Sequence, residues 1–380
     1  MEEYITRSVE PMIMNYLRPN KVVVLLGSRR VGKTQLLNRI IENLGEPYLL
    51  LNGDDQDTLN LLEVKSTTNY ERLLGKIRFL IIDEAQEIPN IGMKLKLMVD
   101  TIKDLKILVT GSSVLDINNS VGEPLVGRKM TFHLYPFSQV ELSSKENYLQ
   151  TIQNLENRLI FGSYPELEFL KTNNEKINYL KEQINSYLLK DILAYEGIQK
   201  REKIVSLLRI IAYRVGSEVS IESIGNELGI SKNTVDKYLD LLSKVFIIHK
   251  VSGLSRNLDN EITKKSKWYF YDNGIRNAII SNFNAIDLRD DQGKLWENYL
   301  IAERIKLQEY SKGYGVNYFW RTHGKQEIDW IEECDGQFHA FEFKWNKKSK
   351  AKIPSQWKIG YPTAEFQIVD RTNFMDFISY

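Results

Sequence analysis

A glycine-rich turn carrying a lysine and a threonine follows a short apolar run near the amino-terminus. Residues 27–34 read Gly-Ser-Arg-Arg-Val-Gly-Lys-Thr, after Lys-Val-Val-Val-Leu-Leu at 21–26. In a G-x-x-x-x-G-K-[ST] pattern, the glycines let backbone N–H groups turn toward phosphate oxygens, and the following helix adds its positive end. The spacing therefore predicts a nucleoside triphosphate site. The alternative is a chance glycine turn ahead of a helix.

The residues of this turn have expected contacts. Lys33 would reach the phosphate oxygens, and the Thr34 hydroxyl would bind Mg²⁺. The residues expected to contact the cofactor, ATP, form one consecutive run: Gly27, Ser28, Arg29, Arg30, Val31, Gly32, Lys33, Thr34 and Gln35.

Two carboxylates, Asp83 and Glu84, end a second apolar run at residues 79–82. Beside a phosphate loop, Asp83 would hold Mg²⁺ through its water shell, and Glu84 would polarise the attacking water. This pair predicts hydrolysis in addition to binding. Strand ends are also acidic for solubility alone, which is the alternative for an isolated run of this kind.

Hydroxyl side chains at Thr110, Ser112 and Ser113 follow a third apolar run, at residues 107–109. We expect Thr110 to sense the γ-phosphate or to hold the attacking water. A turn rich in small polar residues gives the same letters and is the alternative.

Arg128 follows a glycine in the sequence Leu-Val-Gly-Arg. We expect it to neutralise transition-state charge in a neighbouring subunit, which would require a homo-oligomer. The alternative is an ordinary surface arginine in an ion pair.

A second group of ionisable residues lies near the carboxy-terminus. Glu342 and Lys344 are two apart on a predicted strand and share one face, whereas the apolar residues between and beside them face a core: Phe341, Phe343 and Trp345. If Asp329 on the preceding strand is in matching register, Asp329 and Glu342 would hold a divalent cation, and Lys344 would face the water or a phosphoryl oxygen. Glu297 would be a third ligand, and Glu327 a ligand or a neighbour. The alternative is a cross-strand ion pair on a solvated sheet face.

Lysines without intervening acids follow these residues, with Trp345 and Trp357 among them: Lys344, Lys347, Lys348, Lys350, Lys352 and Lys358. A cationic stretch beside metal ligands suits a phosphate backbone. A solvated loop is the alternative.

The elements that position the first group alternate between strand and helix. Strand-like runs at 22–26, 48–51, 79–82 and 107–110, with amphipathic segments between them, predict a parallel sheet wrapped by helices. Residues 145–194 have helical periodicity. Toward the end, a helix at 295–310 precedes strands at 316–321, 327–332 and 338–344, a short link and a strand at 365–369, which gives an α-β-β-β-α-β order.

Between these regions, residues 201–272 predict a winged helix-turn-helix, with strands at 245–251 and 267–271. Lys232 and Asn233 on the third helix are expected to meet a major groove. A basic wing would add phosphate contacts through Arg256, Lys264, Lys265 and Lys267. Winged helices also serve as spacers or protein contacts, which stays the alternative.

Bulk composition narrows the classes of protein. The 380 residues carry 51 basic and 50 acidic side chains, so any surface for a polyanion must be local. The single cysteine, Cys334, excludes an intramolecular disulfide and fits a reducing compartment. The amino-terminus lacks the pattern of a signal peptide, and no apolar run approaches the ~18 residues of a membrane span. We expect a cytoplasmic protein without membrane contact.

The order of these blocks resembles the prokaryotic AAA-type ATPases that carry a C-terminal domain of unknown function with a nuclease-like fold. The matching blocks are residues 27–34, 80–86, 110–113, 125–128, 135–138, 161–165, 267–274 and 293–298. The acidic and lysine pattern resembles the PD-(D/E)xK nuclease fold. The family resemblance implies ATP binding with Mg²⁺ and a nuclease-like domain. For residues 161–165, Phe-Gly-Ser-Tyr-Pro, the sequence suggests no chemistry.

Together these observations predict an α/β protein of four parts. We expect an AAA-type P-loop domain at 1–144, a helical lid at 145–200, a winged helix-turn-helix at 201–272 and a small PD-(D/E)xK nuclease-like domain at 273–380. The expected function is a Mg²⁺-dependent ATPase that couples ATP to DNA engagement, with metal-dependent nuclease activity and a second divalent metal in the last domain. The alternative is an ATP-driven switch or adaptor that binds protein or DNA without cleavage.

Overall fold

The computed structural model describes residues 4–112, 125–188, 192, 201–255, 266–311, 313, 315–322, 324, 326–346 and 352–379. The chain forms two compact units. The first comprises Met1–Tyr135 with Lys244–Phe246, and the second comprises Pro136–Ser243 with Ile247–Tyr380. Each unit is described by itself. Among the helices of the described ranges, none has both the length and the apolar composition that a membrane crossing requires.

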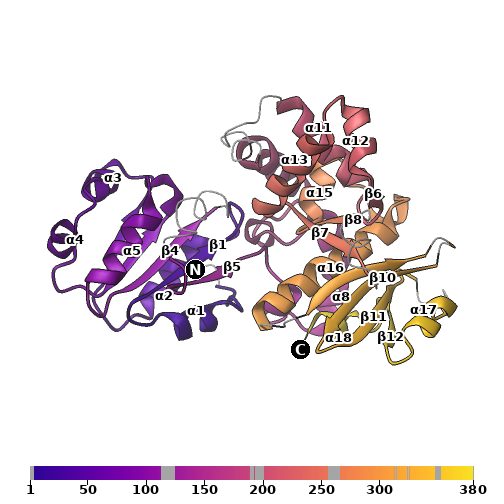
Figure 1. The fold of residues 1–380 in the computed structure, drawn as a ribbon. Coiled ribbons are helices and arrows are strands. Elements are labelled where there is room, and N and C mark those ends of the chain that lie inside the picture. Colours follow the sequence, from indigo (N-terminus) through magenta and orange to yellow (C-terminus); the bar gives the residue numbers. More distant parts are fainter. Residues whose placement is uncertain are drawn as a thin grey trace. The chain divides into compact units, whose positions relative to one another are not determined.

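The first unit is built on a parallel five-stranded sheet of order β2-β3-β4-β1-β5 (Figure 1). Its strands are β1 (Lys21–Leu26), β2 (Leu49–Asn52), β3 (Phe79–Asp83), β4 (Lys106–Gly111) and β5 (Lys129–His133). The parallel sheet and its first four strands are therefore as predicted. The sequence analysis did not single out β5, a short strand at the edge of the sheet with one buried residue among its five.

Helix α1 (Glu10–Tyr16) precedes the first strand. The strands are connected by α2 (Lys33–Glu42), α3 (Gln56–Glu63), α4 (Thr67–Leu74), a 3₁₀ turn at Ala85–Glu87 and α5 (Ile91–Thr101). All five residues of β3 are buried, as are the last five residues of β1. Burial of this kind follows when helices cover both faces of a parallel sheet.

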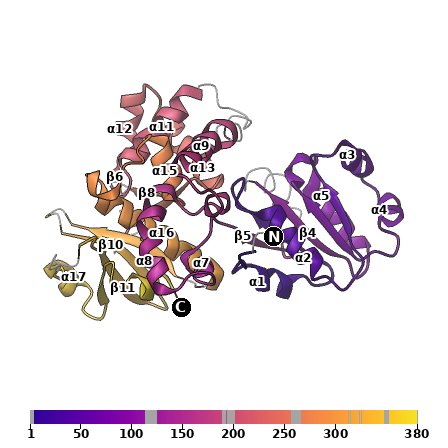
Figure 2. The ribbon, with the colours of Figure 1, turned by 180° about the vertical axis from the view of Figure 1, so that it is seen from behind.

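The second unit contains a seven-stranded mixed sheet of order β12-β11-β10-β9-β7-β8-β6 (Figure 2). The strands are β6 (Glu218–Val219), β7 (Ile248–Gly253), β8 (Ser266–Phe270), β9 (Val316–Arg321), β10 (Glu327–Cys334), β11 (Gln337–Phe343) and β12 (Glu365–Val369). β7 pairs with β9, so one sheet joins the two segments that the sequence suggested as separate domains. The four-part division stays a prediction.

Helices of this unit precede and follow the strands. They are α7 (Gln139–Leu142), α8 (Tyr148–Phe161), α9 (Asn173–Glu182), α11 (Arg201–Tyr213), α12 (Ile221–Leu228), α13 (Lys232–Lys244), α15 (Asn273–Ile279), α16 (Gln292–Ser311), α17 (Ser355–Gly360) and α18 (Phe374–Ile378). Shorter helical turns lie at Pro165–Glu168, Gln183–Leu188 and Ile286–Leu288. From α16 onward the order is the α-β-β-β-α-β order expected from the sequence.

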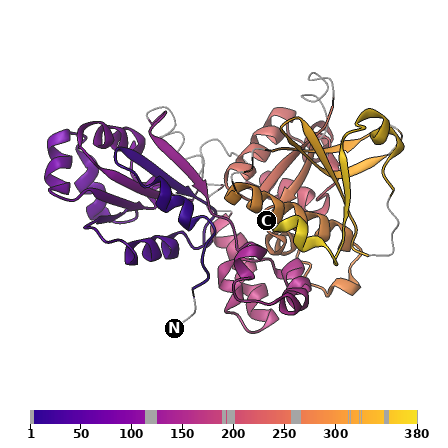
Figure 3. The ribbon, with the colours of Figure 1, turned by 90° about the horizontal axis from the view of Figure 1, so that it is seen from below.

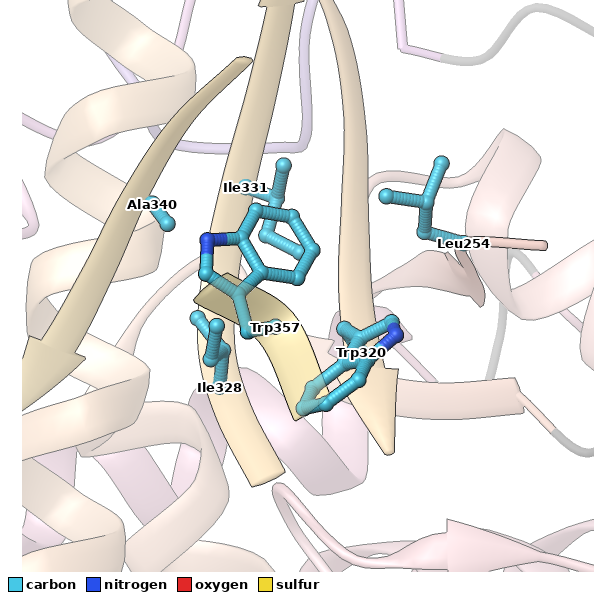
Figure 4. Packing of buried hydrophobic residues seen from close by; sticks show 6 residues of the cluster. All are labelled: Leu254, Trp320, Ile328, Ile331, Ala340 and Trp357. Carbon is cyan, nitrogen blue, oxygen red and sulfur yellow. The ribbon is translucent and has the colours of Figure 1, made fainter. Parts of the chain in front are cut away.

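Apolar residues of β9, β10, β11 and α17 form a core on one side of this sheet, together with Leu254 (Figure 4). Trp357 is 1% exposed, and its ring meets that of Trp320 edge-on at 5.3 Å between centroids. Trp345 is 9% exposed. The burial of Trp345 agrees with the core face expected for it, and the burial of Trp357 removes this indole from any surface that the neighbouring lysines form.

The block at residues 161–165 closes around Asp272, which caps α15. The Asp272 carboxylate accepts hydrogen bonds from the backbone N–H groups of Ser163 (2.8 Å) and Ile275 (3.1 Å). A Cβ atom at Gly162 would lie 2.0 Å from that carboxylate. The Phe-Gly-Ser-Tyr-Pro block thus has a structural role, close packing against Asp272, that the sequence alone did not indicate.

Polar contacts then fix α16. Asn298 exchanges hydrogen bonds with the backbone N–H (2.7 Å) and C=O (3.0 Å) of Phe270 on β8. Farther along, the terminal helix α18 packs beside α16 (Figure 3), where Arg304 donates to the carbonyl of Phe377 at 2.6 Å. These contacts hold α16, and therefore Glu297, against the sheet.

Candidate functional site

The glycine-rich turn of the first unit connects β1 to α2. Gly32, directly before α2, has φ +94°, a left-handed conformation that favours glycine. At Gly27 a Cβ atom would lie 2.3 Å from the carbonyl oxygen of Leu134, so no larger residue fits without movement of the backbone. The turn therefore requires glycine at both positions, at Gly32 for its backbone conformation and at Gly27 for space.

Lys33 begins α2 and is 5% exposed. Its Nζ donates to the carbonyl oxygens of Gly27 (3.0 Å) and Ser28 (3.2 Å), so the ammonium lies over the turn. The sequence pattern predicts that the Lys33 ammonium contacts phosphate oxygens at this turn.

Three predicted side chains meet at the carboxyl ends of β3 and β4. Thr34 Oγ1 donates to Asp83 Oδ2 at 2.8 Å, and Thr110 Oγ1 donates to Asp83 Oδ1. Because β4 lies between β1 and β3, Thr110 reaches Asp83 from the neighbouring strand. A hydroxyl and a carboxylate side by side are the oxygen donors that Mg²⁺ prefers, so these residues fit the predicted cation.

Glu84 follows β3 in a left-handed conformation with φ +48°. Its backbone N–H donates to Thr110 Oγ1 at 3.2 Å, and its carboxylate accepts from Gln86 Nε2 at 2.5 Å. Sequence reasoning gave Gln86 no role, although it belongs to one of the blocks that carry the family resemblance. The contact with the predicted water-activating carboxylate makes Gln86 a positioning residue of this site.

Arg128 lies at the opposite end of the sheet. Its carbonyl accepts from the N–H of Val22 near the start of β1, whereas the glycine-rich turn follows the end of that strand. A six-residue strand spans roughly 17–20 Å at ~3.3 Å per residue, so Arg128 does not reach the turn of its own chain. Its Nε forms an ion pair with Asp100 at 2.6 Å. A role in a neighbouring subunit stays a prediction.

In the second unit, ionisable side chains from α16, β8, β10 and β11 gather in one place, which we call the carboxylate cluster: Lys267, Glu297, Glu327, Asp329, Glu342 and Lys344. Asp329 Oδ2 accepts from the N–H of Phe343 at 2.9 Å, and Lys344 Nζ donates to Glu342 Oε1 at 2.6 Å. The antiparallel pairing of Trp330 with Phe341 makes Asp329 and Glu342 the next residues on the two strands. The register predicted for these carboxylates is therefore the observed one.

Lys267 has a different environment from the one expected of a basic wing. Its side chain is 2% exposed, and its Nζ lies 2.6 Å from Glu327 Oε1 and 3.6 Å from Glu297 Oε1. The prediction that Lys267 contacts DNA phosphates is wrong, because burial against these carboxylates removes it from the surface. The other expected wing residues, Arg256, Lys264 and Lys265, lie outside the described residues, as do Lys347, Lys348, Lys350 and Ser113.

Burial raises the pKa of three carboxylic acids of the cluster, Glu297, Asp329 and Glu342. It raises the pKa of Glu297 to about 7, against the opposing effect of the Lys267 ammonium. It also raises the pKa of Asp329 and, with the added charge of Asp329, that of Glu342. Burial works against protonation of Lys344, but the hydrogen bond with Glu342 leaves the pKa of that ammonium raised.

The carboxylate cluster offers one open acceptor. Within the described ranges, Glu342 Oε2 is buried and has no hydrogen-bond partner. Carboxylate oxygens suit a divalent cation, so Asp329 and Glu342 fit the predicted one. Across the part of the chain that the structure describes, no group of three or more His, Cys, Asp or Glu side chains is arranged to hold a metal ion. Glu297 as a third ligand stays a prediction.

The predicted helix-turn-helix residues lie on a surface. Lys232, Asn233, Asp236 and Lys237 are exposed on α13, while Val235 and Leu239 are buried. Ser231 Oγ accepts from the N–H of Thr234 at 3.1 Å and so stabilises the start of this helix.

Comparison with known families agrees with the first unit. Residues 19–143 match a family described as an AAA domain. The match covers the glycine-rich turn, Asp83, Glu84 and Thr110, and it supports ATP binding. Residues 152–286 and 292–374 match two domains of unknown function (DUF8612 and DUF4143), whose descriptions give no activity for the carboxylate cluster.

Relatives that resemble most of the chain are uncharacterized prokaryotic proteins. One from Methanocaldococcus jannaschii is 25% identical over 334 residues, which are 83% of this chain and 73% of that protein. One from Mycobacterium tuberculosis is 24% identical and covers 85% and 70% of the two chains, respectively. One from Haemophilus influenzae is 25% identical and covers 82% and 79%.

Solved structures show weaker similarity. A Signal Transduction ATPase with Numerous Domains protein with a tetratricopeptide repeat sensor, from Pyrococcus horikoshii, is 14% identical with a TM-score of 0.33, covering 82% of this chain and 48% of that one. Bacteroides Pif1 helicase bound to single-stranded DNA is 17% identical with a TM-score of 0.26, covering 48% and 50%. The chain thus spans about half the length of the solved structures it matches.

Proposed function

We propose that this chain is a Mg²⁺-dependent ATPase that couples ATP binding and hydrolysis to engagement of DNA by its second unit. The observation that carries the proposal is the meeting of Thr34, Asp83 and Thr110 beside the Lys33 turn. The match to an AAA domain supports the same activity. Mg²⁺ would bind at Thr34 and Asp83 and neutralise phosphate charge, while Glu84, held by Gln86, would accept a proton from the attacking water.

DNA engagement rests on the second unit. Exposed Lys232 and Asn233 begin α13, which follows a short helix and a tight turn, as a groove-reading helix does. The strand order from β9 to β12, with the antiparallel register of Asp329 and Glu342, supports a PD-(D/E)xK nuclease-like fold with a divalent cation at these two residues. We also propose homo-oligomers, in which Arg128 serves a neighbour, and a cytoplasmic location, which the single cysteine favours.

ATP turnover measured alone and with single-stranded DNA, duplex DNA or RNA tests this function. We expect stimulation by DNA, which identifies the class of partner directly. If ATP turnover does not change with any nucleic acid, the proposed coupling to DNA is wrong, but the proposed ATPase activity still holds. No heat of ATP binding in calorimetry would contradict the ATPase itself.

A second function, an ATP-driven switch or adaptor that cuts nothing, is favoured by one observation. Lys267 forms ion pairs with both Glu297 and Glu327, as in a structural ion-pair network. Cleavage of labelled DNA with Mn²⁺ or Mg²⁺, lost in Asp329→Ala, would support the nuclease. Absence of cleavage on DNA and RNA would support the adaptor.

A further inference from the structure

Lys267 is the unexpected member of the carboxylate cluster. It lies on β8, in the segment before the predicted nuclease-like part, and it reaches the cluster across the sheet. Lys267 and Tyr269 are two apart on β8 and therefore share a face. Tyr269 Oη donates to Glu297 Oε1 at 2.6 Å, and Lys267 Nζ lies 3.6 Å from the same oxygen. Two donors from one strand thus hold Glu297.

The same ammonium also holds Glu327. Its Nζ lies 2.6 Å from Glu327 Oε1 and 5.2 Å from the centre of the Phe319 ring. A buried ammonium is stable only when carboxylates compensate its charge, so these contacts are a fixed part of the fold. Glu297 and Glu327 thus share one positive charge, whereas Glu342 is paired with Lys344 through Oε1 and its Oε2 is buried without a partner among the described residues.

We propose that Lys267 is a built-in cation of the carboxylate cluster, which occupies the place between Glu297 and Glu327 that a metal ion would otherwise take. The cluster then binds one divalent cation, at Asp329 and Glu342, and Glu297 is a positioned neighbour instead of a ligand. This inference rests on the cation site in the proposed function. It makes β8 part of the site, so the site draws on both segments that the sequence separated.

Counting bound Mn²⁺ by electron paramagnetic resonance tests the inference without any assay of cleavage. The experiment uses the full chain without nucleotide, carrying Asp83→Asn so that the ATP site contributes no ligand from that position. We expect one bound Mn²⁺ in this parent and one more in Lys267→Met, because methionine keeps the length of the side chain and removes its charge. The extra ion should be lost again in Lys267→Met combined with Glu297→Gln.

Lys306→Met is the matched control. Lys306 is also 2% exposed and forms a buried ion pair with Glu303 at 2.7 Å, on the same helix as Glu297. We expect it to lower the melting temperature without changing the Mn²⁺ count. An unchanged count in folded Lys267→Met, with only a lower melting temperature, would overturn the inference.

Glu297→Gln alone keeps the inference testable if Lys267→Met fails to fold. We expect it to retain the single Mn²⁺ of the parent, because Glu297 is held by Lys267 and Tyr269. Loss of that ion would overturn the inference. A parent that binds none while Lys267→Met binds one would remove the cation site from the proposed function and still support the role of Lys267. ATP turnover is measured separately and has no bearing on either count.

Discussion

The nucleotide site takes its groups from one turn and two adjacent strand ends, whereas the carboxylate cluster takes them from α16, β8, β10 and β11. In the first, backbone geometry around Gly27 and Gly32 creates the place for a ligand. In the second, side-chain charges largely satisfy one another, and Lys267 supplies positive charge from within the fold. A site of the first kind suits reversible binding of a polyanion. A site of the second kind is held together before any ligand binds.

Removing Lys33 should have the largest effect on this comparison. We expect Lys33→Ala to lower ATP turnover by at least about 100-fold, because we propose that its ammonium contacts the transferring phosphate. Phosphate release under saturating ATP measures the effect. Arg39→Ala, a change to an exposed cation on the same helix, is the control and should retain turnover. Equal losses in both variants would show that α2, and not the ammonium, is what matters.

Glu84→Gln should separate binding from hydrolysis. The amide keeps the shape of the side chain but cannot accept the proton, so we expect ATP affinity to be retained and turnover to fall about 100-fold. Gln86→Ala leaves the carboxylate in place without its 2.5 Å hydrogen bond, and we expect a smaller fall of about 10-fold. Calorimetry and single-turnover kinetics measure the two quantities. Normal hydrolysis by Glu84→Gln would remove this residue from the mechanism.

Asp272→Ala should affect the second unit alone. The change removes the acceptor for two buried N–H groups and the cap of α15, which we expect to lower the free energy of unfolding by about 3 kcal/mol. Asp272→Asn retains an acceptor oxygen and should lose less. Denaturant unfolding measures the loss, and calorimetry should show unchanged ATP affinity. Weaker ATP binding without a change in unfolding would contradict this assignment.

The sequence predicted well where the relevant contacts are local. The turn at residues 27–34 and the carboxylates at the end of the apolar run 79–82 form short patterns. The strands from β9 to β12 also follow from alternation. Such features depend on neighbours in the chain, so a pattern can indicate them.

Prediction failed where a distant residue decides the outcome. The sequence predicted Lys267 to be a surface charge of a basic wing, and only its distant partners Glu297 and Glu327 explain its burial. The Phe-Gly-Ser-Tyr-Pro block depends on Asp272, which lies 109 positions away from Ser163. No local pattern contains these partners.

The smallest effect that we predict concerns the proton on Glu297. The folded state raises its pKa from an ordinary value near 4.5 to about 7, so between these values the folded chain holds more protons than the unfolded one. The free energy of unfolding must then fall as pH rises from about 4.5 to about 7. A shift of this size is worth roughly 2 kcal/mol or more over the range, so we expect the melting temperature of the second unit to fall by about 5 °C or more, and Glu297→Gln to abolish that fall. The exposed Glu222 of α12 offers a control, since Glu222→Gln should leave the profile unchanged. If the melting temperature of Glu297→Gln has the same pH dependence as that of the parent, Glu297 does not cause the fall, as expected if the Lys267 ammonium keeps this carboxylate ionised.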